Sequence, residues 1–107
     1  MNYDVVFSPE AEEQLASLFR YIADAASPEV AERYTEAIVS YCEGLRRFPQ
    51  RGTTRDDVRP GLRITNFKQR TVIAFDLVPG LVSIIGVFYG GRDFETLLRS
   101  EHEDDDN

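Results

Sequence analysis

The sequence is poor in the residues that carry most catalytic chemistry. Its 107 residues include one cysteine, one histidine and no tryptophan. A single cysteine excludes an internal disulfide. Cys42 falls on the apolar face of a predicted helix, which favours core packing over a nucleophilic role and fits a reduced, cytoplasmic environment. His102 lies in an acidic terminal segment, so a Ser–His or Cys–His pair lacks a well-placed base.

Several other signals are missing. No apolar run is long enough to span a bilayer, and no basic-then-apolar leader opens the chain. No glycine-rich phosphate loop precedes a helix. The acids that follow His102 are typical of a solvated charge run rather than a cation site. We therefore expect no catalytic residues, no metal or other cofactor and no membrane partner.

The charge is distributed unevenly along one domain of ordinary composition. We expect a single domain over residues 1–99 and a disordered acidic tail over residues 100–107, where five acids meet no base. Residues 1–43 carry nine acids and two arginines, whereas residues 44–70 carry eight bases and two acids. The basic middle segment either docks an acidic partner or pairs with the acidic helices of the same molecule.

Two Ser-Pro-Glu signals predict two helices. Ser8 and Ser27 are suited to cap the helices, with proline at the first helical position and an acid in the first turn. The first helix shows apolar residues at helical spacing and ends near Ala25, and Phe48-Pro49 stops the second. Because only a residue or two separates them, the helices should form an antiparallel hairpin.

Residues 81–93, LVSIIGVFYGGRD, predict the most buried strand. Apolar residues fall on both faces, and strict alternation predicts that Val82, Ile84, Gly86 and Phe88 share one face. Gly90-Gly91 then break the strand. The charged pair that follows is either a solvated strand end or a functional edge.

The remaining signals complete the predicted fold. Further strands are predicted over residues 3–7, 62–67 and 70–78, a polar loop over 49–61, and a short last helix over 94–99 that Asp93 caps. Leu97 and Leu98 should fold back onto the domain. The order is β-α-α-β-β-β with a short C-terminal helix. It predicts an α+β fold whose helical hairpin packs on one face of a small, mainly antiparallel sheet.

One catalytic arrangement is open to the sequence. Arg63, Lys68, Arg70 and Arg92 could converge at exposed strand ends and hold phosphates during RNA cleavage. Such a site also needs a general acid and base, for which Tyr89 is the one candidate, and its position suits strand packing equally well.

Four short motifs, in this order and spacing, resemble a known family. They are SPEA at residues 8–11, FPQRG at 48–52, RPGLR at 59–63, and GGRD at 90–93 after the last strand. Together they resemble the ParE toxins of ParD–ParE toxin–antitoxin modules, within the RelE/ParE superfamily. The resemblance covers about residues 3–98 and implies the same β-α-α-β-β-β order.

The resemblance implies a function as well. It implies a ParD-like antitoxin that wraps the hairpin and the sheet, DNA gyrase as the target, and no sequence-specific nucleic-acid binding. The RelE branch instead cleaves mRNA on the ribosome, with basic residues and a tyrosine in the last helix. The corresponding position here is Leu98, and an acidic run follows it, which favours the ParE alternative.

Two contact surfaces are predicted on this basis. For the antitoxin, the candidates are three apolar helix residues, provided that they remain partly open, and three arginines: Leu15, Phe19, Ile22, Arg55, Arg59 and Arg63. For the target, the candidates are Arg92, Phe94 and Leu97. We expect these two surfaces to be separate.

Overall fold

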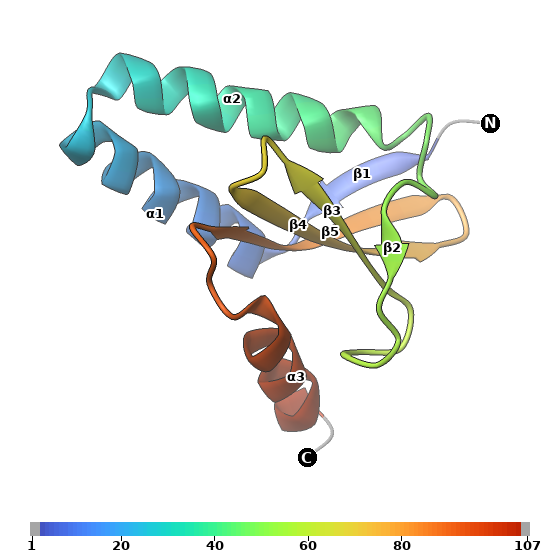
Figure 1. Ribbon diagram of the computed structural model, residues 1–107. Coiled ribbons are helices and arrows are strands. Elements are labelled where there is room, and N and C mark those ends of the chain that lie inside the picture. The colour runs from blue at the N-terminus through green and yellow to red at the C-terminus, as the bar shows by residue number, and fades with distance from the viewer. Residues whose placement is uncertain (1–2, 106–107) are drawn as a thin grey trace.

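A helical hairpin lies on one side of a five-stranded sheet, and a third helix lies on the other (Figure 1). The computed structural model describes the backbone of residues 3–105 and the side chains of residues 3–99. The predicted α+β order is confirmed, with one short strand added in the loop between the second helix and the meander. None of the described helices is long and apolar enough to cross a membrane.

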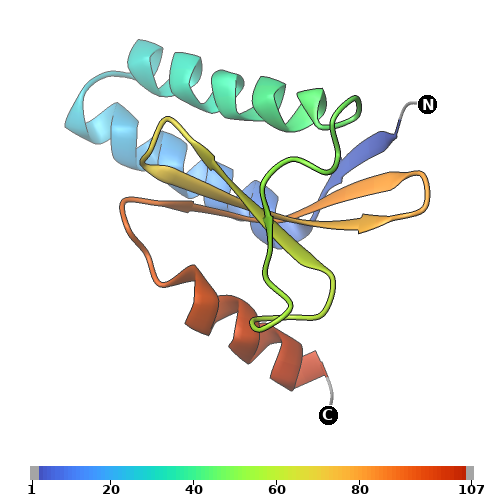
Figure 2. The ribbon, with the colours of Figure 1, turned by 45° about the vertical axis from the view of Figure 1, so that its right-hand side comes forward.

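The hairpin consists of α1 (Pro9–Ala25) and α2 (Pro28–Gly44), and its ends follow the capping signals. The Ser8 hydroxyl accepts a hydrogen bond from the Ala11 amide at 3.0 Å, and the Ser27 hydroxyl accepts one from the Val30 amide at 3.1 Å. Each cap satisfies an amide that the first helical turn leaves without a partner. Figure 2 shows α2 above the strands and α1 behind them.

The sheet has the order β1-β5-β4-β3-β2. Its strands are β1 (Asp4–Phe7), β2 (Thr53–Thr54), β3 (Leu62–Phe67), β4 (Thr71–Val78) and β5 (Leu81–Tyr89). Strands β3, β4 and β5 form the predicted antiparallel meander, and β1 joins it by pairing parallel to β5. The first strand therefore lies at one edge of the sheet, and β5 lies inside it.

A β-bulge in β5 overturns one sequence prediction. Ala74 pairs with Gly86 and Phe75 pairs with Ile84, so Ile85 is an extra residue opposite β4. An extra residue shifts the alternation by one position, and every later side chain changes face. The prediction that positions 82, 84, 86 and 88 share one face is therefore wrong beyond Ile84.

The two faces of the sheet carry two separate cores. Val82, Ile84 and Val87 pack under the hairpin, whereas Phe88 packs on the opposite face. There Phe88 lies over Gly86, where an added Cβ would come within 2.4 Å of its ring. The first core joins residues of α1 and α2 to the sheet: Ala11, Leu18, Ile22, Ala31, Ile38, Cys42, Leu45, Phe67, Ile73 and Phe75 besides those of β5. The second core contains Val58, Leu62, Ala74, Phe88 and Leu98.

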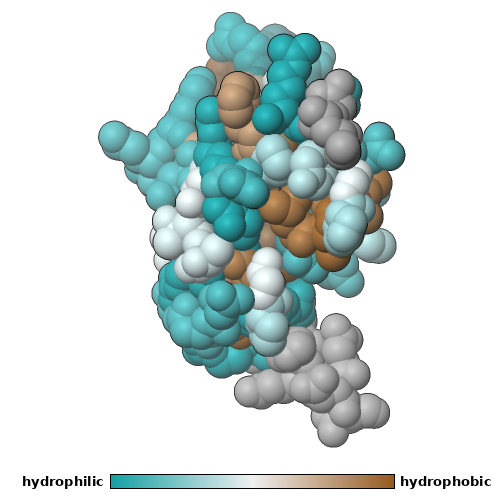
Figure 3. Space-filling model, turned by 90° about the vertical axis from the view of Figure 1, so that its right-hand side faces the viewer, coloured by the Kyte–Doolittle hydropathy of each residue, from teal (hydrophilic) through white to brown (hydrophobic). Residues whose placement is uncertain are grey.

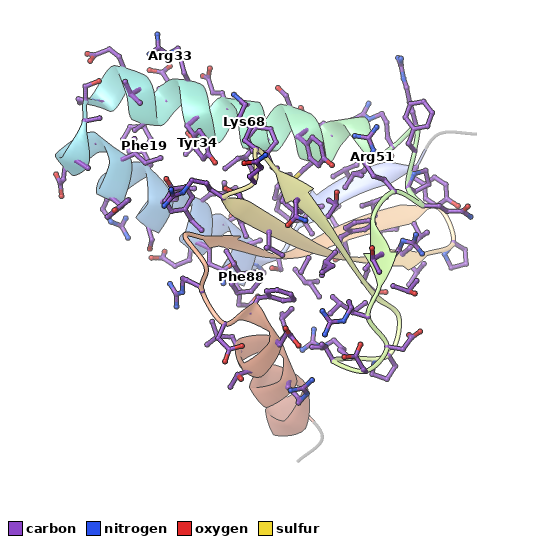
Figure 4. The ribbon with its side chains drawn as sticks, in the orientation of Figure 1. Phe19, Arg33, Tyr34, Arg51, Lys68 and Phe88 are labelled. Atoms are coloured by element: carbon purple, nitrogen blue, oxygen red, sulfur yellow. The ribbon has the colours of Figure 1, made fainter. Side chains whose placement is uncertain are left out.

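Two tyrosines of α2 hold the hairpin on the sheet. The Tyr34 hydroxyl lies 2.9 Å from the Thr71 hydroxyl, and the Tyr41 hydroxyl lies 2.7 Å from that of Thr65. Both threonines are buried. Because Tyr34 and Tyr41 are two helical turns apart, they project from the same side of α2 toward neighbouring strands. Figure 4 shows Tyr34 directed from α2 toward the sheet.

The third helix, α3 (Phe94–Asp105), is longer than predicted. The sequence predicted a helix end at residue 99, and this is wrong, because the helix continues to Asp105. Helix propagation is far easier than nucleation, so a helix docked through Phe94 and Leu98 can extend into residues with no apolar side chain. The prediction for residues 106 and 107 lies outside the described residues.

Candidate functional site

A groove between α1 and α2 contains two of the predicted antitoxin contacts. Leu15, Ala16 and Phe19 of α1 line it opposite Thr35, Val39 and their neighbours on α2. Leu15 and Phe19 are half-buried, so both meet the condition that they stay partly open. Figure 4 shows Phe19 between the two helices. We call this surface the hairpin groove.

Ile22 does not belong to the hairpin groove. Its side chain is 9% exposed and packs in the first core. Residues 15, 19 and 22 follow the i, i+4, i+7 spacing of one apolar stripe, and all three contact the first core, but Leu15 and Phe19 are less completely covered than Ile22. Ile22 is therefore a core residue, whereas Leu15 and Phe19 line the groove on the outer surface.

Arg55 is paired inside the molecule. Its guanidinium donates two hydrogen bonds of 2.9 Å to the Asp57 carboxylate and one of 2.7 Å to Glu95 Oε2. These bonds raise the pKa of Arg55 above its ordinary value, and the same contact lowers the pKa of the Asp57 carboxyl. Arg55 also lies over the Phe94 ring at 6.0 Å. We call this set the Arg55 latch, because it ties the segment after β2 to the first turn of α3.

The other two arginines of the predicted antitoxin surface are half-buried as well. Arg63 donates hydrogen bonds to the carbonyl oxygens of Gln50 and Arg51, and so holds the loop that leads into β2. Arg59 has a buried Nε with no partner among the described residues. Two of the three arginines therefore make contacts within the molecule, but their partners lie in the loop and in α3 and not in the acidic hairpin.

The three predicted target contacts lie in different places. Arg92 is exposed just beyond β5, on the side of α1. Phe94 packs against Phe88 in the second core, with ring centres 6.0 Å apart. Figure 4 shows Phe88 between the sheet and α3. Leu98 is buried as predicted, whereas Leu97 is 37% exposed and does not fold back.

The two predicted surfaces also meet. Arg55 was assigned to the antitoxin surface and Phe94 to the target surface, yet the guanidinium of one lies over the ring of the other. The backbone explains the contact, because Figure 2 shows the segment between β2 and β3 beside α3. The two predicted surfaces therefore adjoin at this point, and their separation stays a prediction.

The four basic residues of the catalytic alternative do not converge. Arg63 and Lys68 lie near opposite ends of β3, and five residues of extended chain span about 16 Å. Arg70 and Arg92 line one cleft beside α1 together with Tyr89, the acid–base candidate of the sequence analysis, and Tyr21, which sequence reasoning missed. The available signal was Tyr21, an aromatic residue outside the apolar stripe of α1, which is 61% exposed.

The Cys42 thiol and the Asp93 carboxyl, two further candidate groups, have structural roles. Burial raises the pKa of the Cys42 thiol to about 12, so it stays protonated and unreactive. Hydrogen bonds from Thr96 lower the pKa of Asp93, which accepts the Thr96 amide at 3.1 Å and so caps α3 as predicted. Within residues 3–99, no group of three His, Cys, Asp or Glu side chains is placed to hold a metal ion.

An apolar patch marks the end of the molecule that carries the β4–β5 turn. Figure 3 shows apolar side chains gathered in the middle of this face, with polar side chains around them. Val6 of β1 and Val78 of β4 are each 43% exposed. Val6 belongs to the edge strand, which has a partner strand on one side only.

The fold has relatives of known structure. It is similar to the chromosomal ParDE TA system from P. aeruginosa, with a TM-score of 0.72 and 17% identity, over 82% of this chain and 96% of that one. It is also similar to the toxin–antitoxin complex RelBE2 from Mycobacterium tuberculosis, with a TM-score of 0.62 and 19% identity, over 83% and 99% of the two chains. These likenesses establish a common fold.

The sequence also matches a family profile. No curated protein sequence matches the chain. The profile described as "ParE toxin of type II toxin-antitoxin system, parDE" matches residues 5–94, which include the hairpin, the sheet except Asp4, and the first residue of α3. The chain therefore belongs to the ParE toxin family of type II toxin–antitoxin systems.

Proposed function

We propose that this ParE toxin is a non-enzymatic inhibitor of DNA gyrase in the cytoplasm, and that a ParD-like antitoxin silences it. The observation that carries the proposal is that neither Arg63 nor Lys68 lines the cleft that contains Arg70, Arg92 and Tyr89, so the basic residues of the catalytic alternative do not form one site. Catalysis of RNA cleavage needs positioned groups that give and take a proton, and charge alone does not replace them.

The position of Leu98 supports the same conclusion. Where the resemblance to the RelE branch requires a catalytic tyrosine, this chain has a leucine that is 1% exposed in the second core. A side chain there packs α3 onto the sheet and has no hydroxyl to offer. The last helix therefore contributes an apolar anchor where a nuclease needs a polar group.

The hairpin groove is our candidate antitoxin site. An amphipathic helix binds such a groove by placing its apolar residues against partly open ones, here Leu15 and Phe19. The solved relatives named above are toxin–antitoxin assemblies, which supports an antitoxin partner for this chain. Copurification with the product of the adjacent reading frame tests the partner directly. Phe19→Asp should abolish copurification, whereas Arg33→Asp, at an exposed position on α2, should retain it.

A ribosome-dependent endoribonuclease is the alternative function. The similarity to the RelBE2 complex and the pair Arg70 and Arg92 in one cleft favour it. Expression of the toxin in cells, with plasmid supercoiling and mRNA integrity followed from the same culture, separates the two. The proposal predicts altered supercoiling before any loss of mRNA. Rapid mRNA cleavage with unchanged supercoiling would establish the alternative instead.

A further inference from the structure

The cleft beside α1 has the chemistry of a binding site for an acidic peptide. It has a volume of about 460 Å³ and lies where β5 ends. Leu18 and Val87 give it an apolar wall, and two tyrosines and two arginines surround that wall: Tyr21, Tyr89, Arg70 and Arg92. We call it the Arg70–Arg92 cleft.

The backbone around the cleft is held in place. The Gln14 side chain accepts a hydrogen bond from the Val87 amide at 2.6 Å, which fixes α1 against β5 just after the bulge. The Arg70 carbonyl accepts one from the Gly90 amide at 2.9 Å, which joins the start of β4 to the end of β5. The two arginines therefore extend from neighbouring, tethered points of the chain.

The aromatic rings form a connected cluster beside the cleft, with tilted and edge-to-face contacts. Arg70 lies over the Tyr89 ring at 5.6 Å, and the centre of that ring is 6.1 Å from the Tyr21 ring and 5.9 Å from the Tyr34 ring. A guanidinium held against an aromatic face loses part of its freedom before a ligand arrives, so less entropy is lost when it binds a carboxylate. Tyr21 offers an exposed apolar surface beside it.

The charges of the cleft favour an anion. Within residues 3–99, no carboxylate lies within ion-pair distance of Arg70 or Arg92. Glu13 lines the cleft, but Arg20 Nη2 lies 3.3 Å from its carboxylate oxygen and offsets its charge. Two guanidinium groups therefore remain available to carboxylates of a ligand.

A peptide fits these features better than a nucleic acid does. The solvent side of α1 carries exposed acids, including Glu10, Glu12 and Asp24, and the whole chain has a net charge of −7. A phosphate backbone that follows the surface for several nucleotides would meet this negative charge. A short peptide with one or two carboxylates beside an aromatic or branched apolar side chain meets only the two arginines and the apolar wall.

We propose that the Arg70–Arg92 cleft binds a short acidic segment of the target protein, with its carboxylates on the two arginines and an apolar side chain between Tyr21 and Leu18. The assignment of the peptide to the target rests on the proposed function, whereas the chemistry of the cleft does not. Arg92 was predicted to contact the target together with Phe94 and Leu97. In the structure Arg92 instead lines a cleft with Arg70 and Tyr21.

A titration with defined peptides tests the cleft without any target. The probe is a fluorescein-labelled hexapeptide, Glu-Asp-Phe-Glu-Asp-Leu, and its uncharged counterpart is Gln-Asn-Phe-Gln-Asn-Leu. We expect saturable binding of the acidic peptide to the full chain and at least about tenfold weaker binding of the uncharged one. Arg70→Glu and Arg92→Glu should each weaken binding by about tenfold or more, and Arg70→Lys by much less.

The controls decide between a cleft and general charge attraction. Arg33→Glu makes the same charge change on the outside of α2 (Figure 4) and should leave peptide affinity unchanged. Equal binding of both peptides, equal effects of the three charge reversals, or displacement of the acidic peptide by a single-stranded 12-nucleotide RNA at lower concentration would each overturn the proposal. Circular dichroism confirms that each variant is folded.

A second measurement separates this proposal from the proposed function. Arg70→Glu should relieve growth inhibition and leave antitoxin affinity within about twofold, because one surface charge outside the antitoxin site changes affinity little. Loss of antitoxin affinity instead would assign the cleft to the antitoxin and overturn the assignment to the target. Unchanged supercoiling in cells that make the wild-type toxin would refute gyrase as the target without affecting the peptide titration.

Discussion

Leu98→Ala is expected to detach or strongly destabilise α3, whereas the neighbouring Leu97→Ala is expected to do little. Leu98 is 1% exposed and lies in the second core with Phe88 and Leu62, while Leu97 is 37% exposed. Truncation of a buried leucine to alanine costs roughly 2–5 kcal/mol, depending on how far the site can collapse. Because α3 packs at the periphery, we expect about 2–3 kcal/mol for Leu98→Ala and less than about 0.5 kcal/mol for Leu97→Ala.

Urea unfolding followed by circular dichroism measures the global effect, and amide hydrogen exchange locates it. If α3 unfolds with the rest of the domain, the whole transition moves to lower urea in Leu98→Ala. If α3 opens on its own, exchange rises in residues 94–99 and stays slow in β4. Equal effects of the two substitutions, by either method, would refute the packing of α3 through Leu98.

Three further predictions concern the rest of the domain. Thr71→Val leaves the Tyr34 hydroxyl without its partner and should cost about 1–2 kcal/mol in urea unfolding, and the loss should shrink in a Tyr34→Phe background. Above about pH 8.5 the unfolded Cys42 thiol ionises while the folded one stays protonated up to about pH 12, so stability falls by about 1.4 kcal/mol per pH unit; Cys42→Ala should lack this component. Arg55→Met should speed amide exchange in the first turn of α3 at pH 7. In the wild type, the stabilisation from the Arg55–Asp57 contact is complete above the ordinary pKa of an aspartate carboxyl. It is lost as the pH falls through the lowered pKa of Asp57.

The hairpin could be predicted from the sequence because its signals are local. Ser8 and Ser27 each cap a helix within three residues of themselves, and the proline that follows each one fixes the first turn. The meander follows from short connections between strands by the same reasoning. These features depend on residues that are close in sequence.

The bulge and the latch could not be predicted, because each depends on a distant partner. Whether Ile85 is extra depends on the register with β4, and the alternation of β5 looks regular until that register is known. The Arg55 latch joins residues 40 positions apart, and nothing near Arg55 indicates Glu95. The sequence therefore indicates which charged and aromatic residues are candidates, but it does not indicate which of them lie together in the folded protein.

The most direct test of the account is the activity of purified DNA gyrase with this protein added, followed by supercoiling of a relaxed plasmid. The account predicts inhibition that rises with toxin concentration, is relieved by an equimolar amount of the cognate antitoxin, and occurs without cleavage of mRNA on purified ribosomes. Full gyrase activity at saturating toxin, together with ribosome-dependent cleavage of mRNA, would contradict it.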